Sequence, residues 1–168
     1  MSRISILFFV FAAFITASLF GSVSAETGPN ASGQPIPRFV SLNSDEVNVR
    51  SGPGVRYPIQ WIYQRKNMPM QVIAEYDTWR KVRDWEGTEG WVHRAMLSGR
   101  RGAIVIAEET TLRQDPNLAS PAVARLMSGV VGLIDKCGAS WCHLETHGVE
   151  GWIPRDTVWG LFKDESVQ

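Results

Sequence analysis

The clearest structural signal in this chain is the stretch Asn48-Val49-Arg50-Ser51-Gly52-Pro53-Gly54. A short run of strand-forming residues ends there in Gly-Pro-Gly, which cannot continue a strand and indicates a loop. The pattern returns further along the chain as Thr111-Leu112-Arg113, followed by Asp115-Pro116-Asn117. The same local structure is therefore expected twice.

Four more landmarks repeat at a nearly constant spacing of 61 to 63 residues. They are Pro58 with Pro121, Val72-Ile73 with Leu133-Ile134, Trp79-Arg80-Lys81-Val82 with Trp141-Cys142-His143-Leu144, and Gly90-Trp91-Val92 with Gly151-Trp152-Ile153. Self-similarity at one fixed spacing is typical of homologous units. We place these units at residues 38–98 and 102–163.

Each unit is predicted to be all-β. Short runs at residues 71–74, 79–84 and 90–93 are bounded by turn residues, and no stretch after the N-terminal segment has a convincing helical period. Tight turns are expected at Gly87 and Gly148, which tolerate positive φ. Five or six short strands in about 60 residues favour a small closed barrel, because closure removes exposed sheet edges.

Side-chain alternation predicts which residues face each core. Along residues 79–84, Arg80, Val82 and Asp84 share one face, and the residues between them share the other. We expect Val82, and Leu144 in the second unit, to point inward. Ile59, Trp61 and Tyr63 also alternate and are expected to fill the first core. Asp84, Glu86 and Glu89 are expected to be solvated charges at one turn.

The N-terminus has the order of parts of a secretory signal peptide. Arg3 is followed by an almost wholly apolar run at residues 4–20 and then by Val23-Ser24-Ala25. We predict a signal peptide at residues 1–25, cleaved after Ala25, and a periplasmic or secreted protein; a retained membrane anchor is the alternative. Residues 26–37 are predicted to form a flexible linker.

Charge composition excludes one class of partner. The chain has 17 basic and 17 acidic residues, so losing Arg3 with the signal leaves a net charge near −1. Nucleic-acid binders usually carry a basic excess, and this chain has none. No second apolar run reaches membrane-spanning length. We therefore expect neither nucleic-acid binding nor membrane association after cleavage.

The motifs in residues 38–163 resemble the bacterial SH3 (SH3b) domain, and are most similar to exported proteobacterial proteins with two such units. The segments that carry the resemblance are Asn48–Gly54, Trp79-Arg80-Lys81-Val82 and Gly90-Trp91-Val92. The second unit departs from the pattern where Asp115-Pro116-Asn117 replaces the glycines. The resemblance implies two tandem five-stranded barrels that bind cell-wall peptides, glycan or protein partners.

Cys137 and Cys142 bracket a predicted hairpin turn. An even cysteine count in an exported chain favours a disulfide between them. Two free thiols are the alternative. A zinc site with His143 and His147 is disfavoured, because neighbours on a strand point to opposite faces. A cysteine nucleophile with a histidine base is excluded if the disulfide forms.

Tryptophans are the candidate ligand contacts, and the chain has seven of them. The resemblance places Trp79 and Trp141 at the start of the groove-lining strand. It matches Trp91 and Trp152 to the aromatic of the Gly-aromatic-aliphatic motif, and Pro154 to the groove proline. Packing within or between the barrels is the alternative for each tryptophan. Trp85, at a turn tip, is a contact candidate because a large apolar residue is expected to be exposed there.

We therefore predict a non-catalytic binding or adaptor protein without cofactor or metal, whose partner is peptidoglycan or an envelope protein. Met96 and Thr157 stand where eukaryotic SH3 grooves have a further tyrosine, which argues against proline-rich ligands. Two alternatives remain. One is a structural or regulatory subunit whose tryptophans join the barrels; the other is an accessory cell-wall hydrolase.

Overall fold

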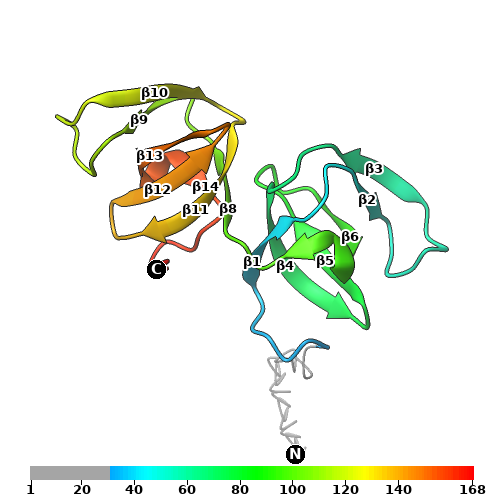
Figure 1. Cartoon of the computed structure of the whole chain (residues 1–168). Helices are drawn as coiled ribbons and strands as arrows, with labels where there is room; N and C mark the ends of the chain where they lie inside the picture. Colours follow the sequence, from blue (N-terminus) through cyan, green and yellow to red (C-terminus); the bar gives the residue numbers. More distant parts are fainter. Residues whose placement is uncertain (1–30) are drawn as a thin grey trace, which may run out of the picture.

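A computed structural model describes residues 31–168 of the chain. The predicted signal peptide and the start of the predicted linker lie outside the described residues. Within them the fold is all-β, arranged as two seven-stranded sheets that lie side by side (Figure 1). No helix in this part of the chain is long and apolar enough to span a membrane.

The two sheets have the same strand order, which confirms the internal repeat. The first runs β3-β2-β6-β5-β4-β1-β7 and the second β10-β9-β13-β12-β11-β8-β14. The strands of the first unit are β1 (Arg38–Leu42), β2 (Val47–Arg50), β3 (Ile59–Tyr63), β4 (Pro69–Tyr76), β5 (Trp79–Arg83), β6 (Glu89–His93) and β7 (Leu97–Ser98). Those of the second are β8 (Gly102–Val105), β9 (Glu109–Arg113), β10 (Ala122–Met127), β11 (Val131–Cys137), β12 (Trp141–Thr146), β13 (Val149–Pro154) and β14 (Val158–Trp159).

The predicted all-β class with two units is confirmed, and each unit has seven strands where five or six were expected from the sequence. In the first unit, the short 3₁₀ turn η1 (Arg94–Met96) follows β6, and in the second unit η2 (Arg155–Thr157) follows β13. Each turn reverses the chain. The two-residue strand after it pairs with the first strand of its own unit. Such a short strand carries too few residues for an alternating pattern to be recognised in the sequence.

Each unit has its own hydrophobic core, and alternation predicts most of it correctly. The first core contains Val47 and Val49 of β2 together with Val82 and Val92, and the second contains Leu144 and Ile153. Arg80, Val82 and Asp84 are all buried, as expected for one inward face. In β12, Leu144 is buried while Trp141 and His143 are only half-buried.

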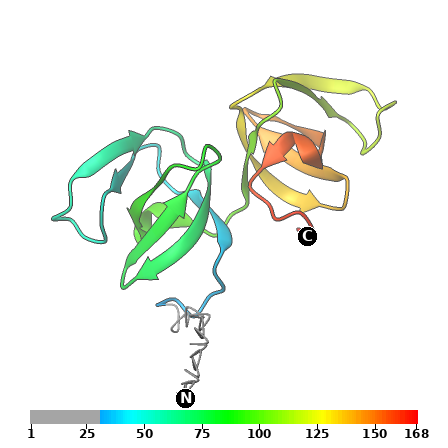
Figure 2. The same cartoon turned by 180° about the vertical axis from the view of Figure 1, so that it is seen from behind.

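The prediction for β3 is wrong. Ile59 is 45% exposed and Trp61 is 38% exposed, so neither fills the first core. The β2–β3 hairpin, like β9–β10 in the second unit, projects away from the junction between the units in both views (Figures 1 and 2). Only Tyr63, near the base of the hairpin, packs against the core.

The expectation for Asp84 is also wrong, because this carboxylate is buried and organises its turn. It accepts hydrogen bonds from the Tyr63 hydroxyl at 2.6 Å and from the backbone N–H groups of Glu86 and Thr88. Burial, together with the hydrogen bond to Asp84, raises the pKa of Tyr63 above its usual range. Gly87 has a φ of 86°, as predicted for a turn glycine.

Aromatic packing and an arginine join the two units. Phe39 of β1 packs against Trp159 and Phe162 of the second unit, with ring centroids 4.9 Å apart in each pair. Arg101, in the connection, donates to the Phe39 carbonyl at 2.8 Å and pairs with Glu165. None of the tryptophans predicted as ligand contacts takes part in these contacts.

Candidate ligand grooves

The outward faces of β5–β6 and β12–β13 carry most of the predicted site residues. Trp79 lies directly opposite His93, and their rings meet edge to face with centroids 5.4 Å apart. At the equivalent place in the second unit, Trp141 lies opposite Pro154. All four residues are half-buried, so each unit offers an aromatic face beside a second ring.

A groove of about 340 Å³ lies on the outward face of the first unit, and we name it the first groove. Its apolar walls are Trp79, Met96 and Val55, and Val55 is 79% exposed. Its other lining residues are polar: Glu46, Asn48, Arg50 and His93. The first groove therefore combines an apolar surface with both signs of charge.

Arg50 and Arg113, which end the repeated segments Asn48-Val49-Arg50 and Thr111-Leu112-Arg113, have the same structural role. The guanidinium of Arg50 donates to the carbonyl oxygens of Val55 at 3.0 Å and Tyr57 at 2.7 Å, which holds the Gly-Pro-Gly loop over the groove. Arg113 of the second unit donates in the same way to the Ser120 carbonyl at 2.7 Å. The repeated arginine therefore positions the loop that borders each groove.

The second unit has a hollow of about 540 Å³, which we name the second groove. Two tryptophans line it, Trp141 and Trp152, together with Pro116 and Lys136. The His143 ring meets Trp152 edge to face with centroids 5.3 Å apart, and His143 hydrogen-bonds Asp135 at 2.8 Å. Burial acts to raise the pKa of Asp135, but the hydrogen bond and the charge interaction with His143, together with the backbone and Lys136, outweigh burial and lower the pKa.

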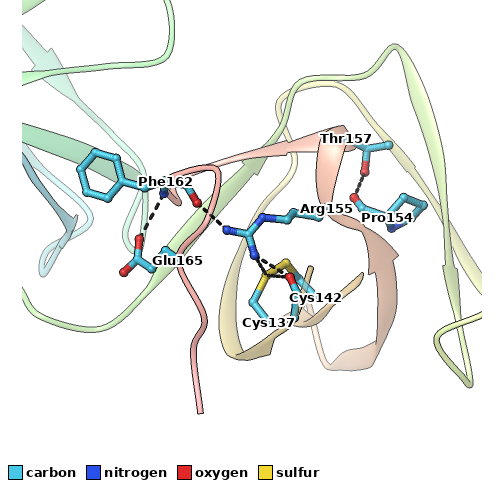
Figure 3. Close-up of a disulfide and its surroundings, with 8 residues drawn as sticks. Cys137, Cys142, Pro154, Arg155, Thr157, Phe162 and Glu165 are labelled. Carbon is cyan, nitrogen blue, oxygen red and sulfur yellow. Dashed lines mark hydrogen bonds between the residues drawn. A yellow bond between two sulfur atoms is a disulfide. The ribbon is translucent and has the colours of Figure 1, made fainter. Parts of the chain in front are cut away.

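The predicted Cys137–Cys142 disulfide is present, and Cys137 lines the second groove. The two residues lie opposite each other, at the end of β11 and near the start of β12. The Nη1 atom of Arg155 lies 3.2 Å from Cys137 Sγ and donates a hydrogen bond of 2.6 Å to the Gly138 carbonyl oxygen. The Nη2 atom of Arg155 donates to the Phe162 carbonyl oxygen (Figure 3). The disulfide therefore sits at the centre of a network that ties the hairpin to the C-terminal segment.

The C-terminal segment supplies the remaining wall of the second groove. Val167 forms a two-way backbone bridge with Cys137, at 2.9 and 3.1 Å, and packs against the second core. Val167 and Gln168 both line the groove beside the tryptophans. The first groove has no such wall among residues 31–168.

The structure brings some predicted site residues together and separates others. Trp141 and Trp152 meet in one groove, whereas Trp91 lies outside the lining of the first groove that Trp79 helps to form. Pro154 is half-buried beside Trp141 but does not line the second groove. Trp85 is not a fully exposed tip residue, because it is half-buried and packs against the first core.

Several residues that line the grooves were not predicted as site residues from the sequence. Asn48 and Arg50 alternate with the buried Val47 and Val49, so the period of two could have identified them as outward-facing. Val167 and Gln168 carry no such signal. They reach Trp141 only because the chain returns across the disulfide.

The alternative zinc and nucleophile sites both require free cysteine thiols. Among residues 31–168, no group of three or more His, Cys, Asp or Glu side chains is arranged to hold a metal ion. Both thiols proposed for the alternative zinc and nucleophile sites are joined in the disulfide. Cys142 is buried while its neighbour His143 faces outward, as expected on a strand.

Comparisons with solved structures give only distant similarities. The structures of NlpC2 and NlpC1 from Trichomonas vaginalis share 12% and 13% identity with this chain, each with a TM-score of 0.34. The similarity covers 73% and 77% of this chain and 48% of each of theirs.

Comparisons of sequence are more informative. A Bacillus subtilis protein, YrvJ, which its name describes as a candidate N-acetylmuramoyl-L-alanine amidase, is 26% identical over 155 residues. The similarity covers 85% of this chain but only 28% of that protein. The model of the bacterial SH3 domain matches twice, at residues 43–99 and 107–160, which is more than half of the chain. Together with the repeated strand order, this match shows that the chain belongs to the bacterial SH3 domain family.

Proposed function

We propose that this protein is an exported, non-catalytic binding protein that recognises peptidoglycan through its second SH3 unit. The observation that carries the proposal is the second groove, where Trp141 and Trp152 line one largely apolar hollow. A tryptophan offers a flat apolar face and one N–H donor, which suits both sugar rings and short peptides. Lys136 at the same groove suits a carboxylate on the ligand.

The relatives support a wall ligand. The similar region of YrvJ lies in a protein named for an amidase of N-acetylmuramoyl-L-alanine, which is a component of the bacterial wall. This chain spans a minor part of that protein, so the similarity supports binding rather than its activity. The signal-like residues 1–25 support export to the compartment that contains the wall.

The structure offers less support for the alternative in which the predicted tryptophans join the barrels. The junction is formed by Phe39, Trp159 and Phe162. Trp79 and Trp141 instead line grooves on their own units. Half-buried aromatic side chains on a groove wall are available to cover a ligand.

Co-sedimentation with purified sacculi tests the proposal. Trp141→Ala and Trp152→Ala should each weaken binding at least about tenfold, because buried aromatic contacts dominate such interfaces. That loss corresponds to about 1.4 kcal/mol of binding free energy. Trp61→Ala is the matched control. Trp61 is 38% exposed and lies outside the lining of both grooves, and the second unit has Ala124 at the equivalent position.

Urea unfolding of the same variants separates binding from packing. The proposal expects Trp141→Ala to bind poorly while remaining folded. A large loss of stability with unchanged binding would instead support the structural alternative, and equal binding by Trp141→Ala and Trp61→Ala would refute the proposal.

A further inference from the structure

Strand β3 of the first unit is an unusually apolar sheet edge. It is the terminal strand of its sheet, and β2 is its only strand partner among the described residues. None of its five residues is charged, and Ile59 and Ile62 are 45% and 46% exposed. Edge strands normally carry charges or other features that prevent pairing with a further strand.

The second unit shows that the fold does not require this apolar edge. Strand β10 occupies the equivalent edge, and the pairing registers align the two strands residue by residue. In the first unit, Ile59 pairs with Arg50 and Ile62 pairs with Asn48. In the second unit, the matching residues of β10 are Ala122, which pairs with Arg113, and Arg125, which pairs with Thr111. Arg125 lies 3.8 Å from Glu109. The second unit therefore has a charged edge where the first has isoleucine.

Ile59 and Ile62 lie on the same face of the sheet as the first groove. Residues directly opposite each other in an antiparallel pair point to the same face. The partners of Ile62 and Ile59 are Asn48 and Arg50, and both line the first groove. The apolar surface of Ile59 and Ile62, which we name the β3 face, therefore continues the groove of Trp79 and Val55 outward to the sheet edge.

We propose that the first unit docks an extended, uncharged peptide strand of a protein partner along β3. The partner's backbone would pair with the free edge of β3, as in recognition by strand addition. Alternate aliphatic side chains of that strand would cover the β3 face and reach the first groove. A charge placed against the apolar side chain of Ile62 would lose part of its water there, so charged strands should bind more weakly.

This proposal goes beyond peptidoglycan binding and assigns different ligands to the two units. A glycan would cover the second groove, where two tryptophans provide flat surfaces, but has no backbone to pair with β3. The second unit cannot accept the same strand, because the charged Arg125 of β10 stands on its edge where the first unit has Ile62. The protein would thus link a protein strand on one unit to the wall on the other.

Titration with a defined peptide tests the proposal. The probe is a short acetylated and amidated peptide of alternating threonine and valine, and binding to the exported protein is followed by NMR chemical shifts. The variant Ile59→Ala/Ile62→Arg carries the second unit's own residues at equivalent positions, so it is expected to fold normally. We expect this variant to bind the peptide at least about tenfold more weakly than the unmodified protein, which is the usual scale for loss of contact residues.

Two controls distinguish this proposal from the proposed function. Trp141→Ala should retain peptide binding and lose sacculus binding, while Ile59→Ala/Ile62→Arg should do the reverse. A probe in which lysine replaces the central valine should bind weakly. The proposal is overturned if the unmodified protein does not bind the uncharged peptide, or if the β3 variant or the lysine probe binds equally well. A β3-dependent dimer in sedimentation would also overturn it, because it would assign the edge to a second copy.

Discussion

Gly90 lies where β6 passes close to β2, and its lack of a side chain allows that approach. A Cβ atom at this position would lie 2.2 Å from Cγ1 of Val49. At the equivalent Gly151, a Cβ atom would lie 2.5 Å from the Arg113 carbonyl oxygen. The glycine of the repeated Gly-Trp motif is therefore a packing requirement of the pair β2–β6 and its counterpart β9–β13.

Gly90→Ala should destabilise the first unit, because the new methyl group must displace Val49 or the backbone of a packed core. Overpacking of this kind typically costs about 1–3 kcal/mol. Urea unfolding measures the loss. Gly99→Ala is the control, since nothing lies within 4 Å of its Cβ position, and its effect should stay within about 0.5 kcal/mol. Equal stability of the two variants would contradict the packing argument.

At the scale of elements, the two units stabilise the same hairpin in different ways. Glu75 of β4 lies opposite Arg80 of β5, and Cys137 of β11 lies opposite Cys142 of β12 at the equivalent position. Glu75 and Arg80 form an ion pair at 3.0 Å, and their side chains are 1% and 5% exposed. A buried ion pair in one unit therefore stands where the other has a disulfide.

Glu75 also holds the segment that precedes β1. It accepts hydrogen bonds from the Ser32 backbone N–H at 2.8 Å and the Ser32 hydroxyl at 2.7 Å, and pairs with Arg38 at 2.6 Å. Burial acts to raise the pKa of Glu75, but the hydrogen bonds from Ser32 and Arg38 outweigh it, so the pKa is lowered from its ordinary value of 4.5. The described end of the predicted linker is thus attached to the first unit.

The two hairpins should loosen under different conditions. A carboxylate with a lowered pKa contributes stability above its ordinary pKa, and this contribution is lost as the pH falls through the folded value. Acidification below about pH 4.5 should therefore reduce the protection of amide hydrogens in residues 38–98, measured relative to their intrinsic exchange rate at each pH. Reduction of the disulfide should reduce protection in residues 102–163. Exchange detected by mass spectrometry resolves the two units.

Glu75→Gln is the control for the acid effect. This variant should be less stable than the parent at neutral pH, because a buried pair has lost one charge. It should also lose the part of the acid dependence that Glu75 provides. An identical change in stability from pH 7 to pH 3 in both proteins would refute the role of Glu75, and faster exchange in both units on reduction would refute the independence of the hairpins.

At the scale of the whole molecule, the aromatic junction determines whether the units behave as one body. Phe39 is 6% exposed between Trp159 and Phe162, and Arg101 connects the Phe39 carbonyl to Glu165. Gly102 allows the close approach, because a Cβ there would lie 2.1 Å from the Asn67 carbonyl oxygen of the first unit. The cores themselves share no buried residue.

Phe39→Ala should uncouple the two units. Truncating a buried phenylalanine typically costs about 3–5 kcal/mol, and here that loss falls on the contact between two separate cores. Differential scanning calorimetry should change from one transition in the parent to two in the variant. Tyr76→Ala removes an aromatic side chain that is 62% exposed in the same unit, and it should preserve the single transition. A single transition at the parental midpoint for Phe39→Ala would contradict the coupling.

Much of the architecture could be predicted because its determinants are local. The repeat of Asn48-Val49-Arg50 as Thr111-Leu112-Arg113 indicates two similar units, and alternation along β5 and β12 correctly places Val82 and Leu144 in the cores. The proximity of Cys137 and Cys142 in a hairpin predicts their disulfide. In each case the pattern depends on residues that are neighbours along the chain or that recur at one spacing.

Local pattern fails where exposure depends on the surroundings of an element. Ile59 and Trp61 alternate like core residues, but a register shift between them turns Ile59 to the face of Ile62 and Arg50. Trp61 stays opposite Val49, yet it is 38% exposed on the projecting hairpin. Asp84 resembles a solvated turn charge, yet the fold buries it beneath Tyr63. Alternation predicts the face of a side chain only along an unbroken strand, and it does not predict whether anything covers that face.

Period-two alternation and short-range geometry are enough to predict the β units, their repeat, most of their inward faces and the disulfide. Three contacts follow only from the folded chain: Phe39 meets Trp159, Val167 borders the groove of Trp141 and Trp152, and Ile59 and Ile62 extend the face of the first groove. These arrangements join residues far apart in the chain. Their physical cause is the path of the folded backbone, which no local pattern records.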